Sequence, residues 1–130
     1  MALNWLAVIA AALSSFVLGG LWYGALFDKV WMKAAGVTPE QVKNGNKAVI
    51  FGGTFVLALI TAATFAIFLG PTIDATTGAL YGFTAGLCWV TTSLGSTYLF
   101  EHKPLSLFLI NGGYRTLQFT LIGLILGAWR

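Results

Sequence analysis

The sequence predicts an all-α fold, namely a polytopic membrane protein built as a bundle of four transmembrane helices. Three observations predict this class: charged residues make up only 8% of the chain, the mean hydropathy is +0.84, and the apolar residues gather in long runs. Soluble domains carry about a quarter charged residues, so this chain lacks the polar surface needed to face water. We interpret the 130 residues as a single domain.

Four apolar runs supply the predicted spans. Each is longer than the roughly 20 residues with which an α-helix crosses the hydrocarbon core of a bilayer. The runs cover residues 3–27, 48–70, 79–100 and 105–129. The first run has no Lys or Arg before it and is too long for the core of a signal peptide, so we interpret it as a retained helix.

The basic residues predict the orientation of the spans. The first and third linkers, which lie on the same side of a four-span protein, contain every lysine of the chain, whereas the second linker, "PTIDATTG", has none. By the positive-inside rule these two linkers are cytoplasmic and both termini lie outside. We therefore expect a multi-pass protein of the inner (plasma) membrane. The net charge of +3 follows from this orientation, and nucleic-acid binding is not indicated.

The first linker, residues 28–47, contains two local signals. "VTPEQV" predicts a helix start, with Thr38 as the cap and Pro39 in the first turn. "DKVWMKAA" places Val30 and Trp31 among lysines, which is typical of a short amphipathic segment lying on the membrane surface. The alternative interpretation is an ordered connector with solvated lysines.

Glycines four residues apart recur in three of the four runs. Without a hydrophobic drive between helices in lipid, close backbone approach over small residues supplies the packing energy. These glycines therefore predict tightly packed helix faces, within one chain or between chains, and the small size of the bundle favours a homo-oligomer. They are Gly20–Gly24, Gly78–Gly82–Gly86 and Gly123–Gly127, with the adjacent pairs Gly52–Gly53 and Gly112–Gly113.

The fourth run places a permanent cation deep in apolar sequence. Arg115 lies about 15 Å along the predicted helix from its cytoplasmic start at Leu105, so snorkelling does not bring its guanidinium fully into the headgroups. Asn111 and Gln118 share its helical face, and Tyr114 borders that face. Because an arginine at the bilayer centre costs about 2.5–3.5 kcal/mol on insertion scales, we expect this face to contact protein or a wet cavity.

No acidic residue lies within the four runs to neutralise Arg115, so it needs carbonyl oxygens, water, a bound anion or a lipid phosphate. Three interpretations stay open. In the first, Arg115 bonds backbone carbonyls and Asn111 or Gln118 and only specifies packing. In the second, it forms a site for an anion, a polar ligand or a lipid headgroup. In the third, it faces lipid with local bilayer thinning. The neighbours expected at its depth, including the indole of Trp89 for a cation–π contact, are Ser14, Ser15, Thr54, Thr61, Trp89, Thr91 and Thr92.

No catalytic or metal-binding set is predicted. His102 is the only histidine and is interpreted as a solvated loop residue, and the single Cys88 as a small core residue. The runs hold no paired carboxylates and no His or Cys cluster, so metal ligation, haem ligation and acid–base hydrolysis lack their parts. We therefore expect no enzymatic activity, no metal and no cofactor.

Two stretches of the chain resemble a known family. They are "LNWLAVIAAALSSFVLGGLWYGALFDKVWMKAAG" at the start and "YLFEHKPLSLFLINGGY…LIGLILGAW" at the end. Both are similar to the domain-of-unknown-function 1761 family of small, mostly bacterial membrane proteins, and the resemblance covers nearly the whole chain. It implies the four-span fold, supplies no reaction, and does not require arginine at position 115. The residues that match its motifs, and are first candidates for a shared site, are Asn4, Trp22, Tyr23, Asn111 and Tyr114.

Two functions are compatible with these observations. In the first, an oligomeric bundle binds or passes a small anion or polar solute at a polar core around Arg115. In the second, an accessory or lipid-binding membrane protein has no substrate, packs against a partner through its Gly-rich helix faces, and holds a phospholipid headgroup with the arginine. The candidate ligand-binding residues are Asn4, Trp22, Tyr23, Trp89, Asn111, Tyr114, Arg115 and Gln118.

Overall fold

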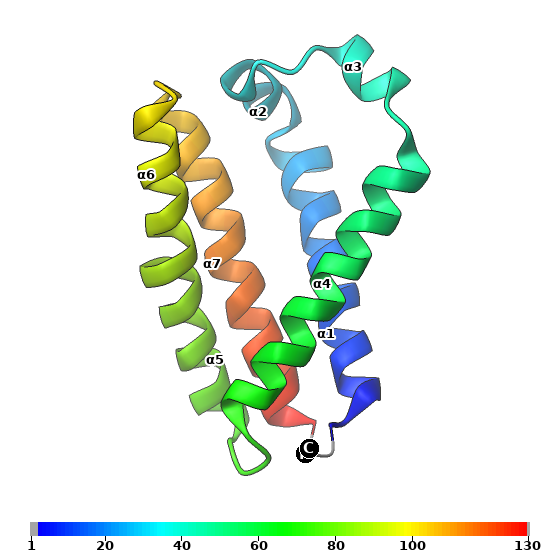
Figure 1. Ribbon diagram of the computed structural model, residues 1–130, viewed down its shortest axis with the longest axis vertical. Coiled ribbons are helices and arrows are strands. Elements are labelled where there is room, and N and C mark those ends of the chain that lie inside the picture. Colours follow the sequence, from blue (N-terminus) through cyan, green and yellow to red (C-terminus); the bar gives the residue numbers. More distant parts are fainter. Residues whose placement is uncertain (1–2, 130) are drawn as a thin grey trace.

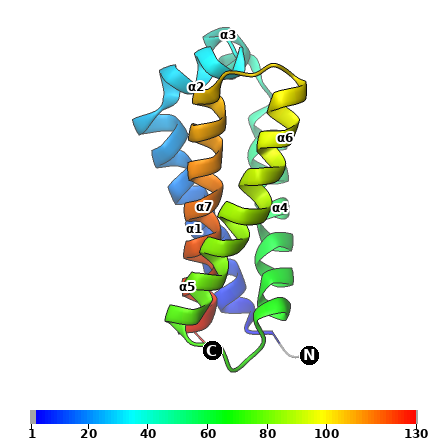
Figure 2. The same cartoon turned by 90° about the vertical axis from the view of Figure 1, so that its left-hand side faces the viewer.

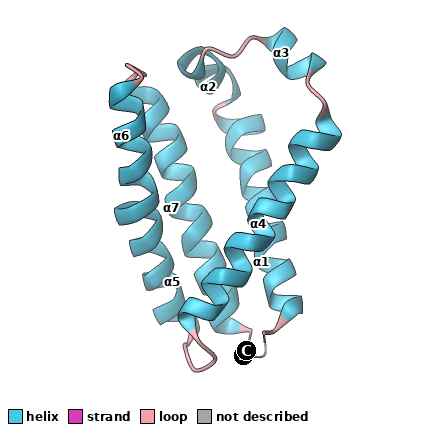
Figure 3. Cartoon of the chain, viewed as in Figure 1, coloured by secondary structure: helices cyan, strands magenta, loops and turns pink. Residues whose placement is uncertain are grey.

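The computed structural model describes residues 3–129, and every regular element within them is a helix (Figure 3). The all-α prediction is therefore confirmed. The long helices run between two ends (Figure 1). One end holds both termini and the turn at 70–74, and the other holds the two short helices of the first linker and the turn at 101–104.

The first apolar run forms one continuous helix in two parts. α1 (Trp5–Gly19) passes directly into a π-helical segment, η1 (Gly20–Leu26). The helix begins at Trp5 because the side chain of Asn4 accepts a hydrogen bond from the backbone N–H of Ala7. It ends at Phe27, whose backbone leaves the helical region (φ −126°, ψ 18°).

The first linker folds into two short helices. α2 (Asp28–Ala35) ends at Gly36, which takes a φ of 74°, a left-handed conformation that favours glycine. α3 (Pro39–Asn44) begins after Thr38. The Thr38 hydroxyl accepts a bond from the backbone N–H of Gln41, whose side-chain oxygen accepts one from the N–H of Thr38. The predicted helix start at Thr38 is therefore confirmed.

The remaining helices follow the other apolar runs, with one difference at the second linker. Asp74 accepts a 2.8 Å hydrogen bond from the N–H of Thr77, so the third long helix begins at Ala75 and not at residue 79. This helix contains a second π-helical segment, in which Cys88 is exposed instead of filling the core. The elements are α4 (Lys47–Leu69), α5 (Ala75–Thr84), η2 (Ala85–Thr91), α6 (Thr92–Phe100) and α7 (Leu105–Ala128).

α5 and α7 are packed so closely that glycine is required at their contacts (Figure 2). A Cβ on Gly82 would overlap the carbonyl oxygen of Phe119, and a Cβ on Gly78 would overlap that of Gly123. The prediction of tight glycine packing is therefore confirmed for this pair of helices. Four other glycines within the helices have open space where a Cβ would lie: Gly20, Gly24, Gly52 and Gly53.

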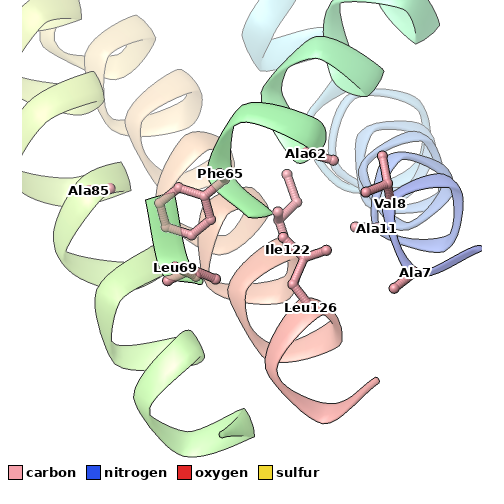
Figure 4. Packing of buried hydrophobic residues seen from close by; sticks show 9 residues of the cluster. All are labelled: Ala7, Val8, Ala11, Ala62, Phe65, Leu69, Ala85, Ile122 and Leu126. Carbon is pink, nitrogen blue, oxygen red and sulfur yellow. The ribbon is translucent and has the colours of Figure 1, made fainter. Parts of the chain in front are cut away.

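The buried apolar core lies toward the end with the termini (Figure 4). It joins α1, α4, η2 and α7 through Ala7, Val8, Ala11, Ala62, Phe65, Leu69, Ala85, Ile122 and Leu126. Toward the other end, α4 diverges from α7 (Figure 1). Within residues 47–57 only Phe55 is partly buried, where its ring meets that of Phe16 at 5.6 Å. The bundle is therefore closed at the terminal end and open toward α3.

Candidate functional site

A cluster of polar and aromatic side chains joins α7 to the first helix and to α6. It begins with a chain of two hydrogen bonds. The hydroxyl of Tyr23 donates to Oδ1 of Asn111 at 2.5 Å, and Nδ2 of Asn111 donates to the hydroxyl of Tyr98 at 2.7 Å. One amide side chain therefore ties three helices together. We call Tyr23, Tyr98, Asn111, Tyr114, Arg115 and Gln118 the α7 polar cluster.

Tyr114 occupies the centre of this cluster and is only 7% exposed. Its hydroxyl donates a 3.1 Å hydrogen bond to the backbone oxygen of Ser15. Its ring meets the edge of the Tyr23 ring, with centroids 5.2 Å apart and an interplanar angle of 64°. The Tyr114 ring also lies beside Gly19, where a Cβ would come into ordinary van der Waals contact with its hydroxyl at 3.4 Å.

Trp22 and Trp31 hold the first helix and α2 in place around the cluster. Nε1 of Trp22 donates a 2.8 Å hydrogen bond to the backbone oxygen of Ile110. The Trp22 ring lies over Gly113, where a Cβ would come within 2.9 Å of it. Trp31 of α2 meets the Tyr23 ring edge-on at 5.5 Å. Trp31 and Tyr114 therefore contact the Tyr23 ring from two different helices, while Trp22 joins the first helix to α7.

Arg115 is the exposed member of the cluster that follows Tyr114 on α7. Nη1 donates a 2.8 Å hydrogen bond to Oε1 of Gln118, whose side chain is buried, and Cζ lies 5.1 Å from the centroid of the Tyr114 ring. The chain's acidic residues all lie outside the long helices, in α2, α3 and the turns. The guanidinium is therefore oriented by an amide and an aromatic face, without a carboxylate in its helix.

The structure brings together six of the eight candidate residues and separates two. Asn4 lies at the opposite end, where Nδ2 donates a 3.1 Å hydrogen bond to the backbone oxygen of Trp129. Trp89 is 58% exposed, and its ring meets that of Phe68 on α4. The predicted contact between Trp89 and Arg115 is therefore wrong. Trp89 lies in η2, where i→i+5 winding changes which residues share a face, and Gly86 is the η2 residue that meets the backbone of Arg115.

The hydroxyl neighbours expected for Arg115 bond other groups instead. Ser14, Thr54 and Thr61 donate to carbonyls three or four residues earlier in their own helices, as such residues commonly do. Thr91 donates to the carbonyl of Gly86 at 2.7 Å and lies 3.1 Å from that of Gly112 on α7. These hydroxyls stabilise the helices and are not bonded to the guanidinium.

An apolar groove of about 400 Å³ lies beside α7 without including Arg115. Gly112 and Gly113 are among its lining residues, and its two threonine hydroxyls already bond backbone oxygens. The groove therefore offers no threonine hydroxyl that is free to bond a ligand. Within residues 3–129, His, Cys, Asp and Glu side chains form no group of three that could hold a metal ion.

Tyr98 was not among the residues predicted for the site. The signal for it lies in the short turn "EHKP", which forces the helices on either side to run antiparallel. Tyr98, three residues before the turn, and Asn111, seven residues after it, then lie on neighbouring helices, where the side chain of Asn111 donates to the Tyr98 hydroxyl.

Two helices of this fold, Trp5–Leu26 and Lys47–Leu69, are long and apolar enough to cross a membrane by length and composition. The fold and cluster therefore define an all-helical protein with candidate membrane spans and a polar site on its last helix. The family model described as "Protein of unknown function (DUF1761)" matches residues 6–127, and the chain belongs to this family, as the resemblance predicted. None of the curated proteins and none of the solved structures compared with the chain matches it.

Proposed function

We propose that the protein spans the inner (plasma) membrane four times, with both termini outside, and binds an oxyanion group at Arg115. The two candidate spans support a membrane location, and the other two long helical stretches, residues 75–100 and α7, contain Arg115 as their sole charged residue. Large apolar side chains are exposed on these stretches too, such as Leu80, Leu99 and Leu109. A lipid environment covers such a surface without the free-energy cost of contact with water.

The observation that carries the anion site is the bonding of the guanidinium. Arg115 donates one hydrogen bond within the described chain, to Gln118, whereas a guanidinium has five N–H donors in a planar fork. A carboxylate or phosphate accepts two of these donors at once, and in a medium of low dielectric such charge-assisted bonds are strong. Because Tyr114 and Gln118 hold the guanidinium in place, little side-chain entropy is lost when an anion binds.

The neighbouring residues of the cluster favour the same ligand. Asn111 donates one of its two amide hydrogens to Tyr98, and the Tyr98 hydroxyl accepts that bond while keeping its own hydrogen. The donors that remain in the cluster are therefore O–H and N–H groups, which suit an acceptor such as an oxyanion. A second cation would meet only repulsion from Arg115.

Two sources supply such an oxyanion, a free anion or the phosphate of a lipid. Purified protein reconstituted in liposomes separates them when inorganic phosphate binding and uptake are measured beside phospholipid retention by native mass spectrometry. We expect Arg115→Leu to abolish phosphate binding if the site takes a free anion, or phospholipid retention if it takes a lipid phosphate. Arg115→Lys should weaken the same signal because an ammonium lacks the planar fork of a guanidinium. Lys103→Gln, which removes a cation outside the helices, is the control. Unchanged phosphate binding and unchanged lipid retention in Arg115→Leu would overturn the proposal.

A second candidate function is that of an accessory protein which assembles with another helix and transports nothing. The four glycines with open space within the helices, at positions 20, 24, 52 and 53, support helix association beyond the single chain. A second copy of this chain is the partner we propose, because these glycines leave two helices of the chain open to close approach. Cross-linking in native membranes and sizing in mild detergent test this assembly, and a monomer in both would contradict it.

A further inference from the structure

The linker helix α2 has two different faces. Lys29 and Lys33, four residues apart, share one face and are both exposed. Val30 lies next to this face and is 52% exposed. Trp31 lies on the opposite side, where its ring packs against Tyr23. α2 is therefore attached to the bundle by its aromatic side, and its lysine face is turned outward.

α3 continues the same kind of surface. Lys43 is exposed on this helix, and Val42 beside it is 48% exposed. Lys47, the first residue of α4, is exposed as well. The capping box at Thr38 and the glycine at position 36 fix the path of the chain, so these side chains are held on ordered helices and not on an unstructured loop.

The position of the linker in the fold places this surface at one end of the two candidate membrane spans. α2 and α3 connect the helices Trp5–Leu26 and Lys47–Leu69, the two candidate membrane spans, and lie across the same end of both (Figure 1). If these helices cross a bilayer, as we proposed above, the linker must lie at its headgroup layer. Lysines pair there with lipid phosphates, and the exposed valines reach the boundary with the acyl chains.

We infer that residues 28–46 bind anionic phospholipid headgroups through Lys29, Lys33 and Lys43, with Val30 and Val42 inserted beside them. The surface of an anionic bilayer offers negative charge and apolar contact at the same depth. The linker helices carry exposed lysines beside exposed valines, which match these two contacts. A nucleic acid would satisfy the lysines but leave the valines in water. Because Trp31 is part of α2, the lipid surface also stabilises the aromatic contact that holds Tyr23 against Asn111.

Hydrogen exchange of the full chain in nanodiscs tests this inference. Amides of residues 28–46 are compared in discs of phosphatidylcholine alone and in discs containing phosphatidylglycerol, at low and high salt. We expect slower exchange with phosphatidylglycerol, and the difference should shrink at high salt because the contacts are electrostatic. Each lysine near an anionic surface contributes about a fivefold change in local binding. K29Q/K33Q should therefore lose most of the lipid-dependent protection.

Matched single variants separate the effect of a lysine in the linker from the effect of the protein's overall positive charge. K33Q should reduce the protection of residues 28–46, whereas K103Q, which removes the same charge from the turn 101–104, should leave it in place. Equal exchange in both kinds of disc at low salt, or an equal effect of K33Q and K103Q, would overturn the inference. Resistance of the protein to alkaline extraction from membranes is measured in parallel. A protein that is embedded but shows no lipid-dependent protection contradicts this inference alone, whereas one that is not embedded contradicts the proposed membrane spans.

Discussion

The hydroxyl of Tyr23 donates a hydrogen bond of 2.5 Å to Oδ1 of Asn111, which joins the end of the first helix to the middle of the bundle. Asn111 in turn donates to Tyr98, so a single amide connects three helices. The contact orders the cluster in which Arg115 lies, because the Tyr23 ring also packs against Tyr114.

Tyr23→Phe should destabilise the protein although the ring is kept. The substitution leaves Oδ1 of Asn111 without its partner, and an unsatisfied group in such a setting costs about 1–3 kcal/mol. Thermal unfolding in mild detergent measures the loss. Tyr81→Phe is the matched control, because Tyr81 is 46% exposed near the other end, and its melting temperature should stay close to that of the unmodified protein. Equal melting temperatures for the two variants would contradict the role given to this hydrogen bond.

Gly82→Ala should be far more harmful than Gly53→Ala. A Cβ at position 82 overlaps the carbonyl oxygen of Phe119, so α5 and α7 must move apart, whereas position 53 has open space. Overpacking of this kind costs about 1–3 kcal/mol or more. The two variants are compared by yield of folded protein and by thermal unfolding. A stable Gly82→Ala protein would show that the two helices do not pack as closely as described.

Gly52→Leu should leave the single chain folded and disrupt its assembly. Nothing within the chain lies near a Cβ at this position, so folding is not expected to change, but a bulky side chain prevents another helix from approaching. Cross-linking in native membranes and thermal unfolding are measured together. An oligomer that persists in Gly52→Leu and in Gly24→Leu would place the interface elsewhere.

Arg115→Leu distinguishes a functional arginine from a structural one. If the side chain only specified packing through Gln118, its removal would destabilise the protein. If it binds an anion, leucine removes a cation whose burial in lipid costs about 2.5–3.5 kcal/mol, and stability should be equal or higher while anion binding is lost. Thermal unfolding and phosphate binding are measured on the same samples. Lower stability with binding retained would support the packing role.

The residue pattern predicted most of the secondary structure, because helix lengths and caps depend on residues that are close together in the sequence. Apolar runs marked the long helices, and the Thr38 cap and the glycine spacing on α5 and α7 were both readable as short-range signals. Helical periodicity also placed Asn111, Tyr114 and Gln118 around Arg115. The start at Ala75 was missed because polar threonines in the first turn conceal a helix that begins with the Asp74 cap.

The contacts between helices were harder to predict, because they depend on rotation and register. Trp89 was predicted to contact Arg115, yet its ring meets that of Phe68 on α4, since the π-helical winding of η2 changes which residues share a face. Tyr98 belongs to the site because the packing of α6 against α7 brings its hydroxyl to Asn111, and the apolar pattern does not specify that packing. Asn4 matches the family motif, yet its side chain caps α1 at the opposite end of the bundle.

The central claim, that the guanidinium of Arg115 binds an oxyanion, is tested most directly by solid-state NMR. The chain has two arginines, so an Arg130→Gln protein labelled at arginine Cζ gives a signal from Arg115 alone. Dipolar coupling between this carbon and ³¹P is measured in phospholipid bilayers, with and without inorganic phosphate. We predict a phosphorus nucleus in direct contact with the guanidinium, from the lipid if coupling is present before phosphate is added and from the free anion if it appears only afterwards. Absence of coupling in both samples, with no shift of the Cζ resonance on addition of phosphate or a carboxylate, would contradict the account.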